Sequence, residues 1–231
     1  MAALYVVATP IGNLEDITIR ALKILRSADF IACEDTRKTR ILTSRYHIRT
    51  RLIPYHEYNK KSSADGIIAN IITKDKNVAL VSEAGTPLIS DPGSYLVRLC
   101  VEKGIKVIPV PGPSSVLAAL SASGLDTSEF TFIGFLPRKP GKRKKELLKL
   151  KEEKRTFILF EPGRNVEKLL SDIYEIFGNV KICYAKELTK IYEFIGTKSL
   201  KTFIEEIKLK PALIKGEIVL AISHVNPDTV D

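Results

Sequence analysis

Short apolar runs alternate with amphipathic segments along the whole chain. Runs rich in β-branched residues, such as LYVVA near the start and VALV further on, are typical of buried strands. The pattern predicts strands over residues 4–8, 30–32, 52–53, 78–81, 105–110, 130–135, 156–160, 180–185, 192–195 and 218–222. Because helical patterns separate most of these runs, their order predicts βαβ units and a mostly parallel sheet.

The helical segments carry apolar residues three or four positions apart and are bounded by capping or stop residues. Asp16 is expected to cap the first helix, whose apolar positions run from Ile17 to Leu25. Further helices are predicted over residues 66–73, over 93–103 with a stop at Gly104, over 116–120 with Ser114 as the cap, over 144–154, over 165–177 with a stop at Gly178, and from residue 199 onward. The predicted fold class is therefore α/β.

The length and one proline-rich interruption indicate two domains. A chain of 231 residues is long for one domain and comfortable for two. The segment KVIPVPGPSS breaks the alternation of strands and helices, which then starts again near residue 130. We expect an N-terminal α/β domain over residues 1–113, with a mostly parallel sheet, and a C-terminal α/β domain over residues 114–231.

The cysteines, the histidines and the apolar runs exclude several classes of protein. Cys33, Cys100 and Cys183 lie far apart and match neither a disulfide framework nor a zinc pattern, so we expect ordinary part-buried thiols. With three histidines, a metal site is not expected. No apolar run approaches the roughly 20 residues of a membrane helix, and no cationic region precedes the apolar N-terminal stretch. We expect a cytoplasmic protein with no membrane contact.

The charge is positive and unevenly distributed. Thirty-six Lys and Arg residues against 27 Asp and Glu residues give a formal net charge of +9. Residues 138–155 hold ten bases and three acids, and residues 34–51 hold six bases and two acids. Basic runs are often only solvated faces, but two separate clusters favour an anionic partner such as nucleic acid.

Four loops rich in Gly and Pro follow predicted strands: ATPIGN, SEAGTPLISDPG, PVPGPSS and LFEPGRN. Glycine permits close approach of the backbone to a ligand, and proline fixes the loop. In open α/β sheets, ligands bind outside the carboxyl ends of the strands. One such loop is commonly a plain strand–helix turn, whereas four of them predict a substantial ligand site. The chain contains neither a Walker loop nor a G-x-G-x-x-G fingerprint.

The motifs of the chain, taken together, resemble a known family. ATPIGNLEDIT, IACEDTR, VSEAGTPLISDPG, VIPVPGPSS, GFLP, KELTK and KGEIVLAI occur in this order over essentially the whole chain. They resemble the ribosomal RNA small-subunit methyltransferase I family, which comprises 2′-O-ribose methyltransferases within the tetrapyrrole (porphyrin/corrin) methylase superfamily. The resemblance implies two α/β domains of the tetrapyrrole methylase type with a cleft for S-adenosylmethionine (SAM) between them. It further implies a homodimer that methylates a decoding-region cytidine in the 16S rRNA of the small ribosomal subunit.

The resemblance also assigns cofactor-binding positions. They are Pro10 and Gly12 after the first strand, Ser82, Glu83, Ala84, Gly85, Thr86 and Ile89 in the long loop, Ser114 and Ser115 at a predicted helix start, and Leu136, Ala185 and Gly216 as adenine neighbours in the C-terminal half. The superfamily's loop usually reads G-G-D-P, whereas this chain has E-A-G-T-P. Glu83 rather than an Asp therefore supplies the nearby acid.

Methyl transfer to a ribose hydroxyl needs in-line alignment and removal of the hydroxyl proton. The candidate bases are Glu34 and Asp35 of CEDTR, and Lys186 and Glu187 of KELTK. CEDTR can also be read as a helix start, because acids are favoured in a first turn. KELTK can also be read as a solvated turn, so the base remains open between the two motifs.

Candidate RNA-binding residues lie in the two basic clusters and in KELTK. Basic side chains hold phosphates, and a ribose 2′-hydroxyl exists only in RNA. The residues expected to contact phosphate are Arg37, Arg40, Lys142, Arg143, Lys145 and Lys190. Two alternatives remain: a SAM-dependent methylase of a tetrapyrrole, such as a cobalamin or sirohaem precursor, and a non-catalytic RNA-binding assembly factor.

Overall fold

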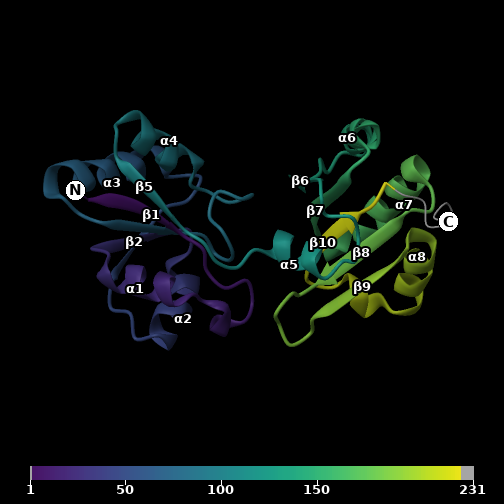
Figure 1. Ribbon diagram of the computed structural model, residues 1–231, viewed down its shortest axis with the longest axis horizontal. Coiled ribbons are helices and arrows are strands. Elements are labelled where there is room, and N and C mark those ends of the chain that lie inside the picture. Colours follow the sequence, from purple (N-terminus) through teal and green to yellow (C-terminus); the bar gives the residue numbers. More distant parts are fainter. Residues whose placement is uncertain (1, 225–231) are drawn as a thin grey trace. The chain divides into compact units, whose positions relative to one another are not determined.

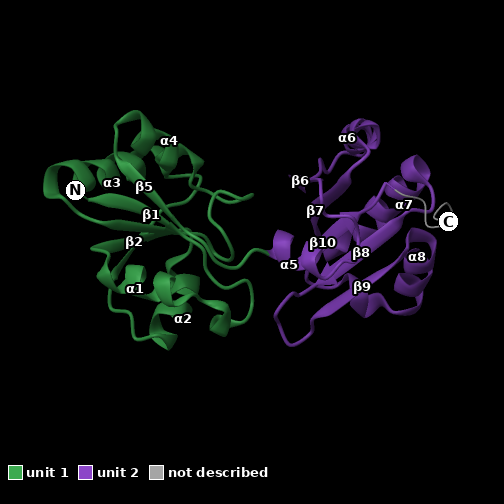
Figure 2. Cartoon of the chain, viewed as in Figure 1, with its two compact units in different colours: residues 1–114 green, residues 115–231 purple. Residues whose placement is uncertain are grey.

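A computed structural model describes residues 2–224 of the chain. The chain divides into two compact units, residues 1–114 and residues 115–231 (Figure 2). Among the described residues, no helix combines the length and the apolar character that crossing a membrane requires. Cys33, Cys100 and Cys183 are buried free thiols, which confirms the expected role.

The first unit is built on one parallel sheet. Its elements are β1 (Ala3–Val7), η1 (Leu14–Asp16), α1 (Ile19–Ser27), β2 (Phe30–Cys33), α2 (Thr36–Arg45), β3 (Arg51–Pro54), α3 (Lys60–Lys74), β4 (Val78–Val81), α4 (Ser94–Glu102) and β5 (Lys106–Val110). The strand order is β3-β2-β4-β1-β5, and every pair is parallel. The parallel sheet predicted for the N-terminal half is confirmed.

Helices cover both faces of this sheet, as Figure 1 shows. Leu25 of α1 and Leu42 of α2 pack on one face, whereas Ile67 of α3 and Leu96 of α4 pack on the other. Strand β4 lies between β1 and β2, and its following helix covers the face opposite to theirs. Neighbouring strands whose loops leave toward opposite faces form the topological switch point at which such sheets bind ligands. The loop after β4 starts at that point.

One local expectation for the first unit is corrected, and one helix is added to those predicted. Thr18, not Asp16, caps α1: its Oγ1 accepts a hydrogen bond from the Ala21 N–H at 3.0 Å. Asp16 lies instead in the short 3-10 helix η1. The apolar pattern does not predict helix α2, because basic and hydroxyl residues interrupt its hydrophobic stripe in TRKTRILTSR. It corresponds to the helix-start interpretation of CEDTR.

The second unit has a mixed sheet. Its elements are α5 (Ser115–Ser121), β6 (Phe130–Phe135), α6 (Pro140–Glu153), β7 (Thr156–Pro162), η2 (Gly163–Asn165), α7 (Val166–Phe177), β8 (Lys181–Lys186), β9 (Phe194–Ser199), α8 (Leu200–Leu209), η3 (Pro211–Ile214) and β10 (Glu217–Ile222). The order is β6-β7-β10-β8-β9, and only β6 and β7 are parallel. The expectation of a mostly parallel sheet is wrong here, because β8 and β9 form an antiparallel pair and β10 is inserted between β7 and β8.

One face of this sheet carries the core of the second unit. Helices α6, α7 and α8 supply residues such as Leu147, Leu169 and Phe203 to a single cluster. The glycine of the LFEPGRN loop serves this packing: a Cβ on Gly163 would lie 1.8 Å from the Ile214 carbonyl oxygen of η3. The fourth Gly/Pro loop is therefore explained by close contact between backbones, without a ligand.

Candidate functional site

Three of the four Gly/Pro loops meet at the carboxyl edge of the first sheet. Thr9, after β1, and Gly85, after β4, exchange backbone hydrogen bonds of 2.9 Å in both directions. Thr86 Oγ1 donates to the carbonyl oxygen of Pro113, beyond β5, at 3.3 Å. Gly85 has a φ of 75°, in the left-handed region, and this backbone conformation favours glycine. Three of the four loops from which the sequence predicts a ligand site therefore lie together within the first unit.

The loop edge retains groups that a polar ligand can use. The side chain of Thr9 is buried, and its Oγ1 has no hydrogen-bond partner among residues 2–224. A buried hydroxyl without a partner is costly, which makes it a candidate contact for a ligand. Glu83, Ala84, Ile89 and Gly12 are exposed at the same edge, whereas Pro10 and Ser82 are buried. Thr9 lies within ATPIGN but was not singled out from the sequence.

An acidic group lies beside these loops. Glu34 follows β2, while Glu83 and Asp91 belong to the loop after β4. Burial raises the pKa of Glu34 above its ordinary value near 4.5; Glu83 and Asp91 raise it further, and Lys38 and His56 act in the opposite direction. Glu34 therefore combines partial burial with carboxylate neighbours, the two causes that make a carboxylate a stronger proton acceptor.

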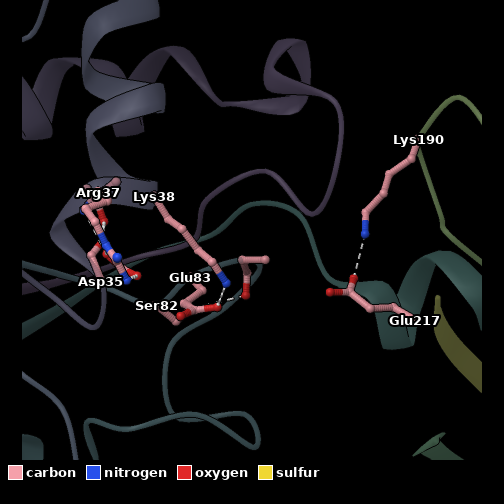
Figure 3. Close-up of polar contacts among 9 residues, drawn as sticks. Asp35, Arg37, Lys38, Ser82, Glu83, Lys190 and Glu217 are labelled. Carbon is pink, nitrogen blue, oxygen red and sulfur yellow. Dashed lines mark hydrogen bonds and ion pairs between the residues drawn. The ribbon is translucent and has the colours of Figure 1, made fainter. Parts of the chain in front are cut away.

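Two kinds of contact hold this acidic group in place: an ion pair between α2 and the loop after β4, and a hydrogen bond within that loop. Lys38 of α2 forms an ion pair with Glu83, which Figure 3 shows as a contact between the helix and the loop. Burial raises the pKa of Asp91, a hydrogen bond from Ser82 lowers it, and Glu83 raises it again. The same hydroxyl lies 3.2 Å from the Ala84 carbonyl oxygen, which is an alternative acceptor for its one proton. Lys38 and His56 are the basic neighbours of this acidic group. Sequence reasoning did not single out these two residues or Asp91.

Asp35 differs from its neighbour Glu34 because its carboxylate is already engaged. It is the N-cap of α2 and accepts a hydrogen bond from the Arg37 N–H at 2.8 Å. The Arg37 side chain also pairs with it at 2.9 Å (Figure 3). Hydrogen bonds from Arg37 lower the pKa of Asp35 to about 2. A carboxylate this acidic is a weak proton acceptor, so the geometry favours Glu34 over Asp35 as the base.

The KELTK segment forms a braced turn between β8 and β9 in the second unit. Glu187 accepts a hydrogen bond from the Glu217 N–H at 2.8 Å and pairs with Lys190 at 3.3 Å. Lys190 also pairs with Glu217 at 2.8 Å (Figure 3). Burial raises the pKa of Glu187, but these contacts outweigh it, and the pKa is lowered. The side chains of Glu187 and Lys190 therefore stabilise the turn, which favours the interpretation of KELTK as a turn over its interpretation as the source of the base.

The other candidate residues of the second unit are also engaged in local structure. Lys186 Nζ donates to the Ala212 carbonyl oxygen at 3.0 Å. Leu136 belongs to the hydrophobic core, and Ala185 is buried in β8. Gly216 is exposed with a φ of 96°, and its position faces Glu187. Ser114 ends the first unit and Ser115 begins α5. These residues can offer a ligand backbone groups more readily than side chains.

Comparison with known proteins identifies the family. The family model of the tetrapyrrole (corrin/porphyrin) methylases matches residues 3–203. A protein of Mesorhizobium japonicum named ribosomal RNA small subunit methyltransferase I is 47% identical over 95% of this chain and 74% of its own length. The protein of that name from Thermotoga maritima is 45% identical, over 96% of this chain and 99% of its own length. The chain belongs to the ribosomal RNA small subunit methyltransferase I family.

Solved structures show that the fold of this family extends to distant proteins. Diphthine synthase matches with a TM-score of 0.70 at 17% identity, over 96% of this chain and 90% of that one. Uroporphyrin-III C-methyltransferase from Thermus thermophilus, complexed with S-adenosyl homocysteine, matches with a TM-score of 0.67 at 16% identity, over 96% and 97% of the two chains. These likenesses confirm the tetrapyrrole methylase fold predicted from the motifs.

The basic residues expected to contact RNA in this family member divide into exposed and buried side chains. Arg37, Arg40, Lys142 and Lys145 are exposed. Arg143 is buried: its guanidinium pairs with Asp172 of α7 at 2.5 Å, and its Nε donates to the same oxygen at 2.6 Å. The prediction that Arg143 contacts phosphate is wrong, because α6 turns this side chain inward while Lys142 and Lys145 face solvent.

Among residues 2–224, no three His, Cys, Asp or Glu side chains are grouped so that they could hold a metal ion. The carboxylates at the edge of the first sheet do offer proton acceptors, and Glu34 is the best placed of them.

Proposed function

We propose that this member of the family methylates the ribose 2′-hydroxyl of a decoding-region cytidine in 16S rRNA, with SAM as the methyl donor. The observation that carries the proposal is similarity over 95% of this chain, at 43–47% identity, to proteins named ribosomal RNA small subunit methyltransferase I. The acidic loop edge of the first unit supports it with a proton acceptor. The homodimer, the cytoplasmic location and a cofactor cleft formed with the C-terminal domain stay predictions.

The loops after β1, β4 and β5 carry polar groups that suit a bound SAM molecule. The buried Thr9 hydroxyl and the exposed residues Glu83 and Ala84 would hold its polar portions. Gly85 and Gly12 allow close approach of the backbone. The bound cofactor supplies a methyl group that is already activated on a sulfonium. The protein has to orient the ribose, exclude water and accept one proton.

Glu34 is the proposed proton acceptor. In this step the O–H bond of the ribose breaks, its proton moves to the Glu34 carboxylate, and the ribose oxygen forms a bond to the methyl carbon as the carbon–sulfur bond breaks. Burial and the charges of Glu83 and Asp91 raise the proton affinity of this carboxylate. General bases of this kind typically contribute about 10²–10⁴-fold to the rate.

The pH dependence of kcat/KM should report Glu34. A protonated carboxylate cannot accept a proton, so activity is expected to fall as the pH drops through the Glu34 pKa, which lies above 4.5. Because Lys38 lowers this pKa, Lys38→Met should move the acid limb of the profile to higher pH. Lys23→Met, at an exposed position of α1, is the matched control and should leave the limb in place. An acid limb that does not respond to Lys38→Met contradicts the assignment.

The exposed lysines of α6 are expected to contribute to RNA affinity without sequence preference. Lys142→Ala and Lys145→Ala should each weaken binding to small subunits. Each should also reduce the slope of log K against log salt by about one for every phosphate that the variant no longer neutralises. Binding titrations at several salt concentrations measure this slope. An unchanged slope in the double variant would show that α6 does not face the RNA.

The proposed activity is tested with labelled SAM and two acceptors, isolated small ribosomal subunits and uroporphyrinogen. We expect label in the 16S rRNA and none in the porphyrinoid. Label in the porphyrinoid alone would replace the proposal with the tetrapyrrole alternative. Saturable binding of small subunits without binding of SAM in calorimetry would indicate the non-catalytic assembly factor.

A further inference from the structure

The loop between β3 and α3 presents an aromatic side chain at the edge that carries Glu34. Tyr58 is 99% exposed, which leaves both faces of its ring in solvent. Its only aromatic neighbour among the described residues is His56, at 6.1 Å between ring centroids and an interplanar angle of 64°. A tyrosine ring combines a large apolar area with a polar tip, so rings of this kind are commonly used in recognition.

The backbone places this loop next to the proposed base. Strand β3 pairs with β2 so that Pro54 lies opposite Cys33, the residue before Glu34. The Tyr55 N–H donates to the Cys33 carbonyl oxygen at 2.8 Å, which continues the pairing past the end of the strand. His56 is close enough to Glu34 to lower its pKa. Tyr58, two residues further on, therefore belongs to a loop that starts at the same edge of the sheet.

The loop holds its own shape. Asn59 Oδ1 accepts a hydrogen bond from the His56 N–H at 2.8 Å, and Asn59 Nδ2 donates to the Pro54 carbonyl oxygen at 3.2 Å. The Asn59 N–H donates to the His56 carbonyl oxygen at 3.1 Å, which closes the turn that carries Tyr58 at its tip. A ring exposed on a closed turn loses little backbone entropy when a ligand covers it.

The surroundings of the ring suit a single-stranded nucleic acid. Lys60 and Lys61 follow in the first turn of α3; Lys60 pairs with Glu57, whereas Lys61 is exposed. Sequence-specific RNA recognition splays bases out and stacks them on aromatic side chains, while nearby cations hold the phosphates. An exposed ring followed by an exposed lysine, on a loop that starts at the edge where Glu34 lies, matches this arrangement.

We propose that Tyr58 stacks on a nucleobase of the RNA and so holds the target ribose against Glu34. The inference rests on the proposed function, because it takes RNA as the substrate of this edge. Tyr58 is a substrate-binding residue in this account, and Glu34 remains the group that accepts the proton.

Kinetics with small subunits test the role of the ring. Tyr58→Ala should raise KM by roughly 5- to 140-fold, the range expected when one base stack is removed, with SAM affinity unchanged. Tyr58→Phe keeps the ring and should stay within about twofold of the wild type. Tyr174→Ala, at an exposed tyrosine of α7, is the matched control. Equal losses in Tyr58→Phe and Tyr58→Ala would assign the effect to the hydroxyl and overturn the stacking proposal.

A direct probe separates this inference from the proposed function. The chain contains no tryptophan, so Tyr58→Trp introduces a single indole at the site. We expect single-stranded RNA oligonucleotides to quench its fluorescence, and Tyr174→Trp to show no quenching. Absence of quenching overturns the stack even if the wild type methylates rRNA. Quenching by intact small subunits but not by RNA alone would indicate a protein contact, which also overturns it. A wild type that transfers no methyl group, with quenching intact, overturns only the proposed function.

Discussion

Glu34→Gln is expected to lower kcat for methyl transfer to small subunits about 10²–10⁴-fold, while the affinity for SAM is retained. Glutamine keeps the shape of the side chain but cannot accept the proton of the ribose hydroxyl. Burial and the neighbouring carboxylates raise the pKa of Glu34 and so make it a stronger proton acceptor. The loss of rate in Glu34→Gln should therefore exceed the loss caused by removing a single hydrogen bond to the substrate. Single-turnover transfer of a labelled methyl group measures the rate, and calorimetry measures SAM binding.

The neighbouring acid supplies the matched control. Asp35→Asn preserves the cap of α2, because asparagine caps helix N-termini about as well as aspartate. It removes the ion pair with Arg37, whose side chain is 90% exposed, so little stability should be lost. We expect a rate within a few-fold of the wild type. A large loss in Asp35→Asn together with near-normal activity in Glu34→Gln would reassign the base to Asp35.

Arg143→Ala is expected to lower the free energy of unfolding by about 3–5 kcal/mol, because the buried carboxylate of Asp172 loses its short contact with Arg143 and keeps only the more distant Lys144, at 3.7 Å, as a cationic neighbour among the described residues. The two side chains are 9% and 12% exposed, and an ion pair reinforced by a hydrogen bond from Nε joins them between α6 and α7. Denaturant unfolding followed by circular dichroism measures the change, and the second unit, which contains both helices, should lose its structure first.

Two further variants make this prediction specific. Replacing both partners, with Arg143→Met and Asp172→Leu, removes the unpaired charge and should restore most of the lost stability. Lys142→Ala, at the preceding exposed position, should change the free energy of unfolding by less than about 0.5 kcal/mol and lower RNA affinity instead. The account is contradicted if Arg143→Ala leaves stability intact and only weakens RNA binding.

The sequence predicted the first unit well, because its strands are short buried runs separated by clear helical patterns. The runs at residues 30–32 and 78–81 needed no tertiary information. Helix α2 was missed because its sequence, TRKTRILTSR, carries a weak apolar stripe, and its start depends on the Asp35 cap. In the second unit, strand direction was mispredicted. Nothing in the β10 run determines that it lies between β7 and β8, since that order is fixed only by the packed sheet.

The candidate site was predictable in part. Loop composition indicated that Gly/Pro segments line a sheet edge, and three of them meet there. The opposite pKa shifts of Glu34 and Asp35 were not predictable from the sequence. The two carboxylates are adjacent, and their pKa values differ because Asp35 caps α2 whereas Glu34 lies beside the acids of the loop after β4. Arg143 and Lys142 are adjacent in a basic run, and only the register of α6 turns the first inward. Lys38 could not be recognised before its contact with Glu83 was known.

The central claim is that this chain methylates a ribose in 16S rRNA, and one measurement tests it most directly. Ribose methylation is mapped along the small-subunit RNA of a strain that lacks this gene, and again after the gene is restored. We predict that a single ribose methyl on a decoding-region cytidine disappears in the first map. It should return with the wild-type gene but not with the Glu34→Gln variant. Identical maps with and without the gene would contradict the account.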